Sequence, residues 1–185
     1  MTPDLERSLT ALLGEIGAGT DRAWDEILPA VYNHLKGVAR KIAGPGSDDA
    51  TITPTALVHD AWAKLAGSAS SDFVDRNHFF AVAAVTMRRI LIDASRRRKT
   101  EKRGGDSHRV TLADVGSPSA SVDLLELDEA LQELEGLSSR QARVVELRFF
   151  AGLGVAEVAE CLGVSIATIE ADWRLARAWL GRRLA

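Results

Sequence analysis

Apolar residues recur every three or four positions along most of the chain, and no run alternates apolar and polar residues as a strand would. This period predicts amphipathic helices, which end at breaks rich in glycine, proline and serine. The predicted helices cover residues 4–16, 21–43, 78–100, 122–136 and 139–151, with another starting at Pro54 and two more between 155 and 180. The pattern therefore predicts an all-α fold.

The last two predicted helices, between Val155 and Leu180, are joined by the short turn Gly163-Val164-Ser165. Gly163 suits a left-handed helix end, and Ser165 suits the N-cap of the helix that follows. Together they predict a helix-turn-helix, whose second helix can enter the major groove of DNA. The candidate DNA contacts on that helix are Ser165, Thr168, Glu170, Arg174 and Arg177. A plain pair of packed helices with a glycine corner is the alternative.

Charge is unevenly distributed, although the 185-residue chain carries a net charge of only −3. The net charge is −4 over residues 1–87, +6 over 88–109, −7 over 110–136 and +2 over 137–185. A basic block inside an acidic chain points to contact with a polyanion such as nucleic acid. The opposite charges of the two central blocks also allow a closed form in which one block masks the other.

Cysteine content and hydropathy narrow the class of protein. Cys161 is the only cysteine, which excludes an internal disulfide. No apolar run approaches the roughly 20 residues of a membrane-spanning helix. The N-terminal residues also lack the basic and apolar regions of a secretory signal. We therefore expect a cytoplasmic protein, without cofactors.

Residues 104–121 contain glycine, serine and proline with little periodicity. Such a composition is typical of a flexible linker. It predicts two helical domains, residues 1–103 and residues 122–185, of which the second carries the helix-turn-helix.

The two halves in this order resemble an extracytoplasmic-function (ECF) sigma factor of bacterial RNA polymerase, over nearly the whole chain. The stretch LSSRQARVVELRFFAGLGVAEVAECLGVSIATIEADWRLARAWL is similar to the fourth conserved region of that family, which binds the minus-35 promoter element. Residues 20–103 are similar to the second region, which holds core polymerase and captures the melted minus-10 element. The segments TPTALVHDAWAKL, HFFAVAAVTMRRILIDASRRRK and DWRLARAWL resemble the subgroup encoded alongside Ser/Thr protein kinases.

The resemblance implies a transcription initiation factor rather than an enzyme, with core RNA polymerase and promoter DNA as partners. The basic side chains of the N-terminal half that can meet DNA phosphates are Arg88, Arg89, Arg96, Arg97, Arg98 and Lys99. By resemblance, the polymerase contacts on the helix that starts at Pro54 are Leu57, Val58, Asp60, Trp62 and Leu65. The loop 67–77 corresponds to the loop that holds a flipped base, with Phe73, Asp75 and Asn77 as candidate contacts.

Two departures from the family pattern bear on regulation and on readout. Where typical members carry an acidic Asp-Ala-Glu-Asp quartet, this chain has Thr53-Pro54-Thr55-Ala56. We therefore expect a Ser/Thr kinase to restore negative charge at Thr51, Thr53 or Thr55, of which Thr55 is the least accessible because it lies inside the first helical turn. Near the start of the second helix of the helix-turn-helix, Glu170-Ala171 stands where Lys-Arg is more usual in the subgroup.

Two other classes of protein fit parts of the sequence. The pair His59-Asp60 is found in metal-dependent phosphohydrolases, but His34, His78 and His108 have no ligand-like spacing. We therefore predict no metal site and no catalytic residues. A stand-alone helix-turn-helix regulator, which binds a duplex operator without polymerase, is the second alternative. The long apolar-then-basic helix over 78–100 favours the sigma factor.

Overall fold

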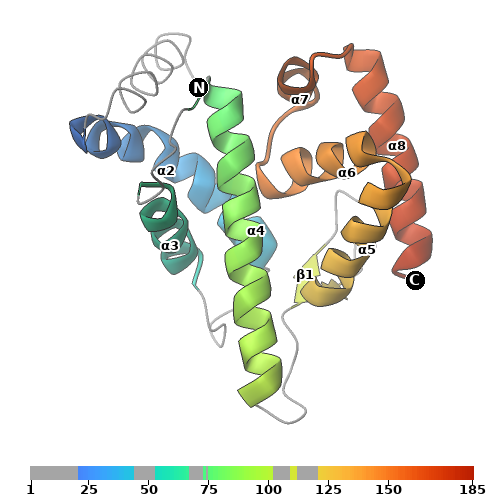
Figure 1. Ribbon diagram of the computed structural model, residues 1–185, viewed down its shortest axis with the longest axis horizontal. Helices are drawn as coiled ribbons and strands as arrows, with labels where there is room; N and C mark the ends of the chain where they lie inside the picture. The colour runs from blue at the N-terminus through green and yellow to red at the C-terminus, as the bar shows by residue number, and fades with distance from the viewer. Residues whose placement is uncertain (1–20, 44–52, 67–72, 74, 102–108, 112–120) are drawn as a thin grey trace.

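The computed structural model describes residues 21–43, 53–66, 73, 75–101, 109–111 and 121–185 (Figure 1). Its elements are α2 (Asp21–Ala43), α3 (Pro54–Ala66), α4 (Arg76–Glu101), β1 (Arg109–Thr111), β2 (Ser121–Asp123), α5 (Leu124–Leu137), α6 (Ser139–Val145), the π-helical turn η2 (Glu146–Phe150), α7 (Val155–Leu162) and α8 (Ile166–Arg183). The predicted all-α fold class is confirmed. The helix predicted over residues 4–16 lies outside the described residues.

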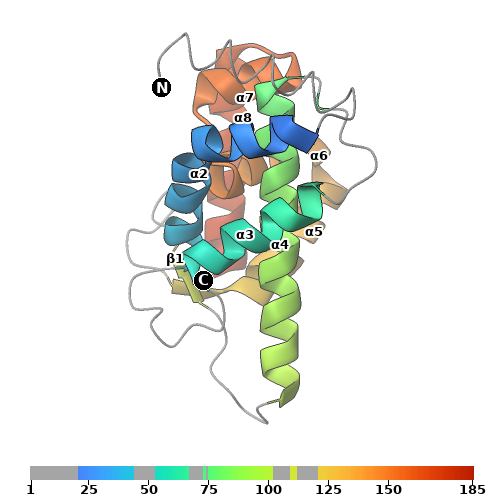
Figure 2. The same cartoon turned by 90° about the vertical axis from the view of Figure 1, so that its left-hand side faces the viewer.

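Helix α4 runs through the middle of the molecule, with α3 on one side and the C-terminal helices on the other, while α2 passes behind it and also contacts η2 and β1 (Figures 1 and 2). Its first half is buried around most of its circumference because helices from both halves of the chain pack on it. The buried residues there include Phe79, Phe80, Ala83, Ala84 and Met87. Its basic second half extends beyond this packing, as Figure 1 shows. The apolar-then-basic pattern over residues 78–100 predicts this division along one helix.

Side-chain caps fix where most of the described helices begin. A carboxylate or hydroxyl oxygen accepts a hydrogen bond from a backbone N–H of the first turn, which would otherwise be unpaired. The caps are Thr53 on α3, Asp75 on α4, Asp123 on α5, Ser138 on α6 and Ser165 on α8. The prediction of Ser165 as a cap is confirmed.

The expectation that the chain contains no strand is wrong for six residues. β1 pairs antiparallel with β2, with Val110 opposite Val122, and Val122 is buried. β1 lies within the predicted linker, and it packs near α2. Three residues are too few for an alternating pattern to show in the sequence, and the pairing depends on a partner ten residues away.

The helix predicted over 139–151 changes type partway. α6 ends at Val145, and the next turn is π-helical: Ala151 N–H donates to the Glu146 carbonyl at 3.3 Å. The wider turn buries Leu147 and Phe150 together. Gly152 follows with a φ of 68°, which turns the chain away from the helix axis.

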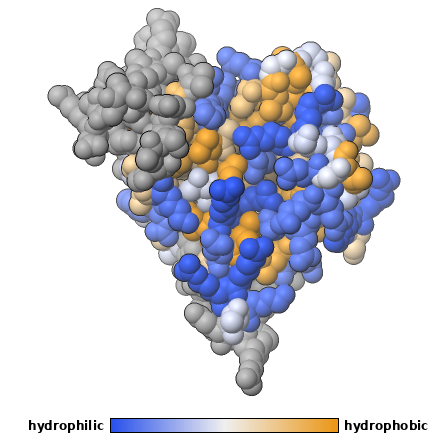
Figure 3. All heavy atoms as spheres, viewed as in Figure 1, coloured by the Kyte–Doolittle hydropathy of each residue, from blue (hydrophilic) through white to orange (hydrophobic). Residues whose placement is uncertain are grey.

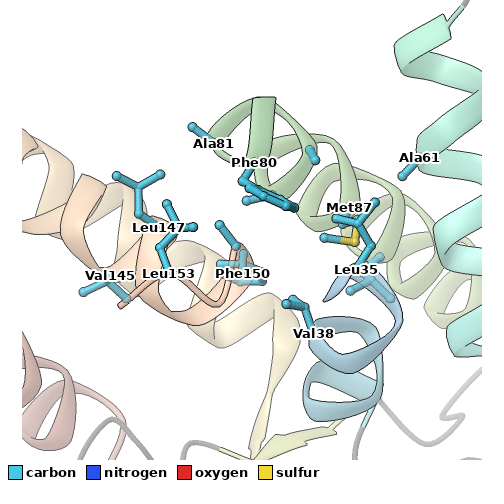
Figure 4. Close-up of a cluster of buried hydrophobic side chains, with 14 of the residues drawn as sticks. Leu35, Val38, Ala61, Phe80, Ala81, Met87, Val145, Leu147, Phe150 and Leu153 are labelled. Atoms are coloured by element: carbon cyan, nitrogen blue, oxygen red, sulfur yellow. The ribbon is translucent and has the colours of Figure 1, made fainter. Parts of the chain in front are cut away.

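The two halves of the chain share one continuous apolar core. Figure 4 shows Phe80 of α4, Val38 of α2 and Phe150 of η2 pointing into the same cluster, and all three are buried. His34 Nε2 also donates a hydrogen bond to the Ala151 carbonyl at 2.8 Å. The described parts of the two halves therefore pack directly on each other.

Candidate nucleic-acid and polymerase interfaces

The helix-turn-helix predicted in the C-terminal half is formed by α7, a turn at Gly163, and α8. Gly163 ends α7 with a φ of 64°, as predicted from its position. Ser165 Oγ accepts a hydrogen bond from Thr168 N–H at 3.2 Å, and the two hydroxyl oxygens lie 2.8 Å apart. These two candidate DNA contacts therefore form the first turn of α8, where Ser165 is exposed and Thr168 is half-buried.

The other candidate contacts of this motif lie along one face of α8. Glu170, Arg174 and Arg177 are spaced by four and then three residues, which brings their side chains onto the same side of the helix. Glu170 and Arg174 are exposed, and Arg177 is half-buried. This face can present two guanidinium groups to phosphates, so these residues remain predicted DNA contacts.

The rotation of α8 is fixed by contacts that the sequence analysis missed. Asp172 is buried, and Arg140 of α6 donates to it from Nε at 2.6 Å. This hydrogen bond and the carboxylate charge raise the pKa of the Arg140 guanidinium. The Arg148 guanidinium lies 4.8 Å from the centroid of the Trp173 ring. Asp172 lies three residues after Ile169, within the apolar stripe of α8. A carboxylate in such a stripe indicates that a cationic partner lies nearby.

Most of the basic candidates on α4 face solvent. The exposed side chains are Arg89, Arg96, Arg97 and Lys99, while the Arg98 side chain lies outside the described part of the structure. Arg96 also lies 3.6 Å from an oxygen of Asp128 on α5. Of the polar residues among them, Asp93 is exposed and Ser95 is buried.

Arg88 is held between two carboxylates of the C-terminal half. Its guanidinium donates to Asp128 Oδ1 at 2.5 Å and to Glu146 Oε1 at 3.2 Å. It also lies 5.7 Å from the centroid of the Phe150 ring. In this conformation Arg88 joins the two halves, and it is not free to meet a phosphate.

The loop residues suggested for base capture are likewise engaged. Phe73 is buried, with its ring centroid 5.2 Å from that of Phe79. Asp75 caps α4 by accepting a hydrogen bond from His78 N–H at 2.7 Å. Asn77 is buried and donates to Glu160 Oε2 of α7 at 2.9 Å. Phe73 and Asn77 are therefore not presented to solvent as an open base pocket would require, whereas Asp75 is exposed.

The predicted polymerase contacts on α3 need correction. Leu57, Val58 and Leu65 are at most 4% exposed, because their face of α3 packs on the core. A side chain this deeply buried supports the helix and cannot reach a partner in this conformation. Asp60 is exposed and Trp62 is half-buried, with its ring 6.4 Å from Phe79. These two residues remain the predicted contacts.

The threonines before and within α3 differ in how they are placed. Thr53 is exposed, and its Oγ1 accepts a hydrogen bond from Ala56 N–H at 3.2 Å. Thr55 is exposed as well, which contradicts the expectation that the first turn makes it less accessible. The helix surface shields only the face directed at the core. Thr51 lies outside the described residues.

The His59-Asp60 pair is exposed on α3, with the His59 ring 6.1 Å from that of Tyr32. Among the described residues, no three histidine, cysteine, aspartate or glutamate side chains are grouped to hold a metal ion. None of the described helices is both long and apolar enough to cross a lipid bilayer.

Cys161 is expected to alkylate more slowly in the folded chain than in the unfolded chain. Burial raises the pKa of its thiol, Arg143 opposes this, and Asp75 and Glu160 add to it. Because folding disfavours the thiolate, the stability of the fold should decrease as the pH rises through the ordinary thiol pKa. Iodoacetamide labelling at pH 8, with and without urea, measures the first effect. Equal rates in the two states would contradict it.

Comparison with known proteins identifies the family. The family model described as "ECF sigma factor" matches residues 6–185. A solved structure, that of CnrH in complex with the cytosolic domain of CnrY, is 20% identical, covers 96% of this chain and 96% of its own, and superposes with a TM-score of 0.43. No curated protein matches the chain significantly. Because the family model spans almost the entire sequence, the chain belongs to the ECF sigma factor family.

Proposed function

We propose that this ECF sigma factor is switched on by threonine phosphorylation at the start of α3, as expected for the kinase-associated subgroup. In this proposal α3 binds core RNA polymerase through its exposed side, which carries Asp60 and Trp62. The basic half of α4 contacts the minus-10 element, and α8 contacts the minus-35 element. The protein acts in the cytoplasm with a Ser/Thr kinase as its regulatory partner.

One observation carries the proposal: the first turn of α3 contains no acidic residue, and exposed hydroxyls are present instead. Thr53 is the N-cap, Pro54 is the first helical residue and Thr55 follows. Exposure of both threonines gives a kinase access to them. The acidic quartet of typical family members belongs at this position.

A phosphate at this place changes both charge and helix geometry. It adds about −1.5 to −2 charges near neutral pH, together with three strong acceptor oxygens. On Thr53, those oxygens can accept the Ala56 N–H that the hydroxyl now accepts. The positive end of the α3 dipole also favours an anion there, by about 0.3–1 kcal/mol. The phosphate would therefore be held in place and presented to a basic surface.

The test is transcription in vitro from a promoter of this sigma factor, with purified core polymerase. We expect a Thr51→Glu/Thr53→Glu/Thr55→Glu variant, or the kinase-treated protein, to bind core and initiate, while the unmodified protein does so at least about tenfold less. Tenfold corresponds to 1.4 kcal/mol of binding free energy, which one or two added charge contacts can supply.

A control places one negative charge at another helix start. Ser139 is exposed in the first turn of α6, so Ser139→Glu adds a carboxylate far from α3 in the sequence. It should not activate. Equal initiation by the unmodified protein would refute the switch. Failure of every variant to bind core would instead favour an operator-binding regulator.

A further inference from the structure

Three carboxylates of the C-terminal half pair directly with polar side chains of α4. Asp128 of α5 and Glu146 of η2 bind Arg88, and Glu160 of α7 accepts a hydrogen bond from Asn77. Asp128 also lies 3.6 Å from Arg96. Figure 3 shows hydrophilic residues along the line where α4 meets the C-terminal helices.

These α4 groups are the ones proposed for nucleic acid. Arg88 and Arg96 are candidate phosphate contacts, and Asn77 is a candidate for holding a flipped base. A carboxylate offers a guanidinium the same kind of charged oxygen acceptors that a phosphate offers. The C-terminal half therefore occupies, with acidic side chains, places that single-stranded promoter DNA would occupy.

The contacts are too enclosed to be a loose surface pairing. The side chains of Asp128, Glu146 and Arg88 are 6%, 12% and 17% exposed. Phe150 lies beneath Arg88, and the apolar cluster around it joins the two halves. Buried charges need their partners, because an isolated one would be costly. The closed arrangement is thus specific to these side chains.

Water nevertheless reaches one side of this cluster. A groove of about 780 Å³ lies between α4 and the helices α5 and α6, and its lining includes Arg88, Arg96, Asp128 and Glu146. Ions and solvent can enter it. Ions can therefore reach these charged side chains while the two halves remain packed together.

We infer that the C-terminal half is an intramolecular competitor of nucleic acid, which masks α4 in the free protein until the halves are separated. The inference rests on the proposed role of α4 in contacting DNA, but not on threonine phosphorylation. It predicts that the DNA-binding side of α4 becomes accessible when, and only when, the two halves separate.

The test weakens the mask from the C-terminal side only, in the full-length protein without polymerase or kinase. The variant Asp128→Asn/Glu146→Gln removes both charges that hold Arg88 and leaves α4 unchanged. The control Glu126→Gln/Glu129→Gln removes two exposed charges from α5, the helix that also carries Asp128. The probe is a fluorescent 20-nucleotide single strand of thymidine, and small-angle scattering reports compactness.

For the wild type we expect a radius of gyration of about 16 Å, the value for a compact chain of this length. The mask variant should expand and bind the single strand at least about fivefold more tightly than the control, since apparent affinity rises with the fraction of open molecules. Its Cys161, which lies near Asp75 of the other half, should also alkylate faster. A gain equal to that of the control would overturn the inference, because it would reflect net charge alone.

A second variant keeps the test decisive if the double replacement unfolds the chain. Glu160→Gln alters one residue of α7 that is itself exposed, and it weakens only the contact with Asn77. Tighter single-strand binding than the control supports the mask, and unchanged binding counts against it. If scattering shows expansion but no variant binds the strand, the DNA-binding role of α4 is wrong. If the compact form persists in both mask variants, the mask itself is wrong.

Discussion

Replacing Gly152 with alanine is expected to lower the free energy of unfolding by about 2–5 kcal/mol. Gly152 has a φ of 68°, and an L-residue in the left-handed region costs roughly 1–2 kcal/mol. A Cβ at this position would also lie 2.7 Å from Val38 Cγ2 of α2, and overpacking of this kind costs about 1–3 kcal/mol. Urea unfolding followed by circular dichroism measures the change.

Two other glycines separate the backbone effect from the clash. Gly163 has a φ of 64° but nothing within 4 Å of its Cβ position, so Gly163→Ala should cost only the strain. Gly181 lies within α8 with open space around it, so Gly181→Ala should stabilise by about 0.5–1 kcal/mol. Adding Val38→Ala to Gly152→Ala should recover part of the loss. If Gly152→Ala costs no more than Gly163→Ala, then Val38 does not press on this turn.

The result bears on more than stability, because Gly152 and Val38 belong to different halves of the chain. The clash exists only while the halves are packed together. Alanine at position 152 should therefore favour opening as well as unfolding, and should speed the alkylation of Cys161. The same variant thus reports on whether the closed arrangement exists in solution.

Local structure was predictable because its causes are local. The stripe from Ile27 to Val38 needs only a helical period to bury one face, and α2 has the predicted bounds. Ser165 and Gly163 act through their own backbone geometry, so their roles at the ends of α8 and α7 could be read from sequence. Such features need no knowledge of the tertiary fold.

Features that depend on distant residues were missed. β1 needs β2 as a partner, and the π-helical turn at Glu146–Phe150 needs an apolar surface that accepts Leu147 and Phe150 together. The Asn77–Glu160 contact joins residues 83 positions apart. The charge pattern allowed a closed form, but no sequence pattern indicated that Arg88 would pair with both Asp128 and Glu146.

The candidate site was predicted in outline and misassigned in detail for the same reason. Family resemblance predicts that α3 contacts polymerase, but it does not say which face of α3 is available. The apolar residues Leu57, Val58 and Leu65 are buried in the core. The exposed residues Asp60 and Thr55 lie on the remaining surface. Burial decides whether a residue of α3 packs in the core or is available to polymerase. The sequence indicates burial only as a periodic apolar stripe.

Replacing Arg174 and Arg177 together with alanine is expected to cause the largest loss of duplex DNA binding. Each phosphate contact adds about 0.9 to the slope of log affinity against log salt, so the slope should fall by about 2. Near 0.15 M salt, the same relation gives a loss of up to about thirtyfold. The loss should be similar for all duplex sequences, because phosphates carry no base identity. Fluorescence anisotropy on two unrelated 30-base-pair duplexes, from 50 to 200 mM salt (about the range where such slopes are measured), tests both statements.

A matched control on the same helix distinguishes phosphate contact from general charge. Arg182 is exposed in the last turn of α8, two turns beyond Arg174. Arg182→Ala removes one positive charge but should leave the slope nearly unchanged, because distant charges are screened at these salt concentrations. A full decrease with Arg182→Ala, or none with the double variant, would mean that α8 meets DNA through a different face. Because Asp172 and Trp173 fix the rotation of α8 on Arg140 and Arg148, that face is set by the fold. A wrong face would therefore count against the helix-turn-helix docking itself, not only against the two arginines.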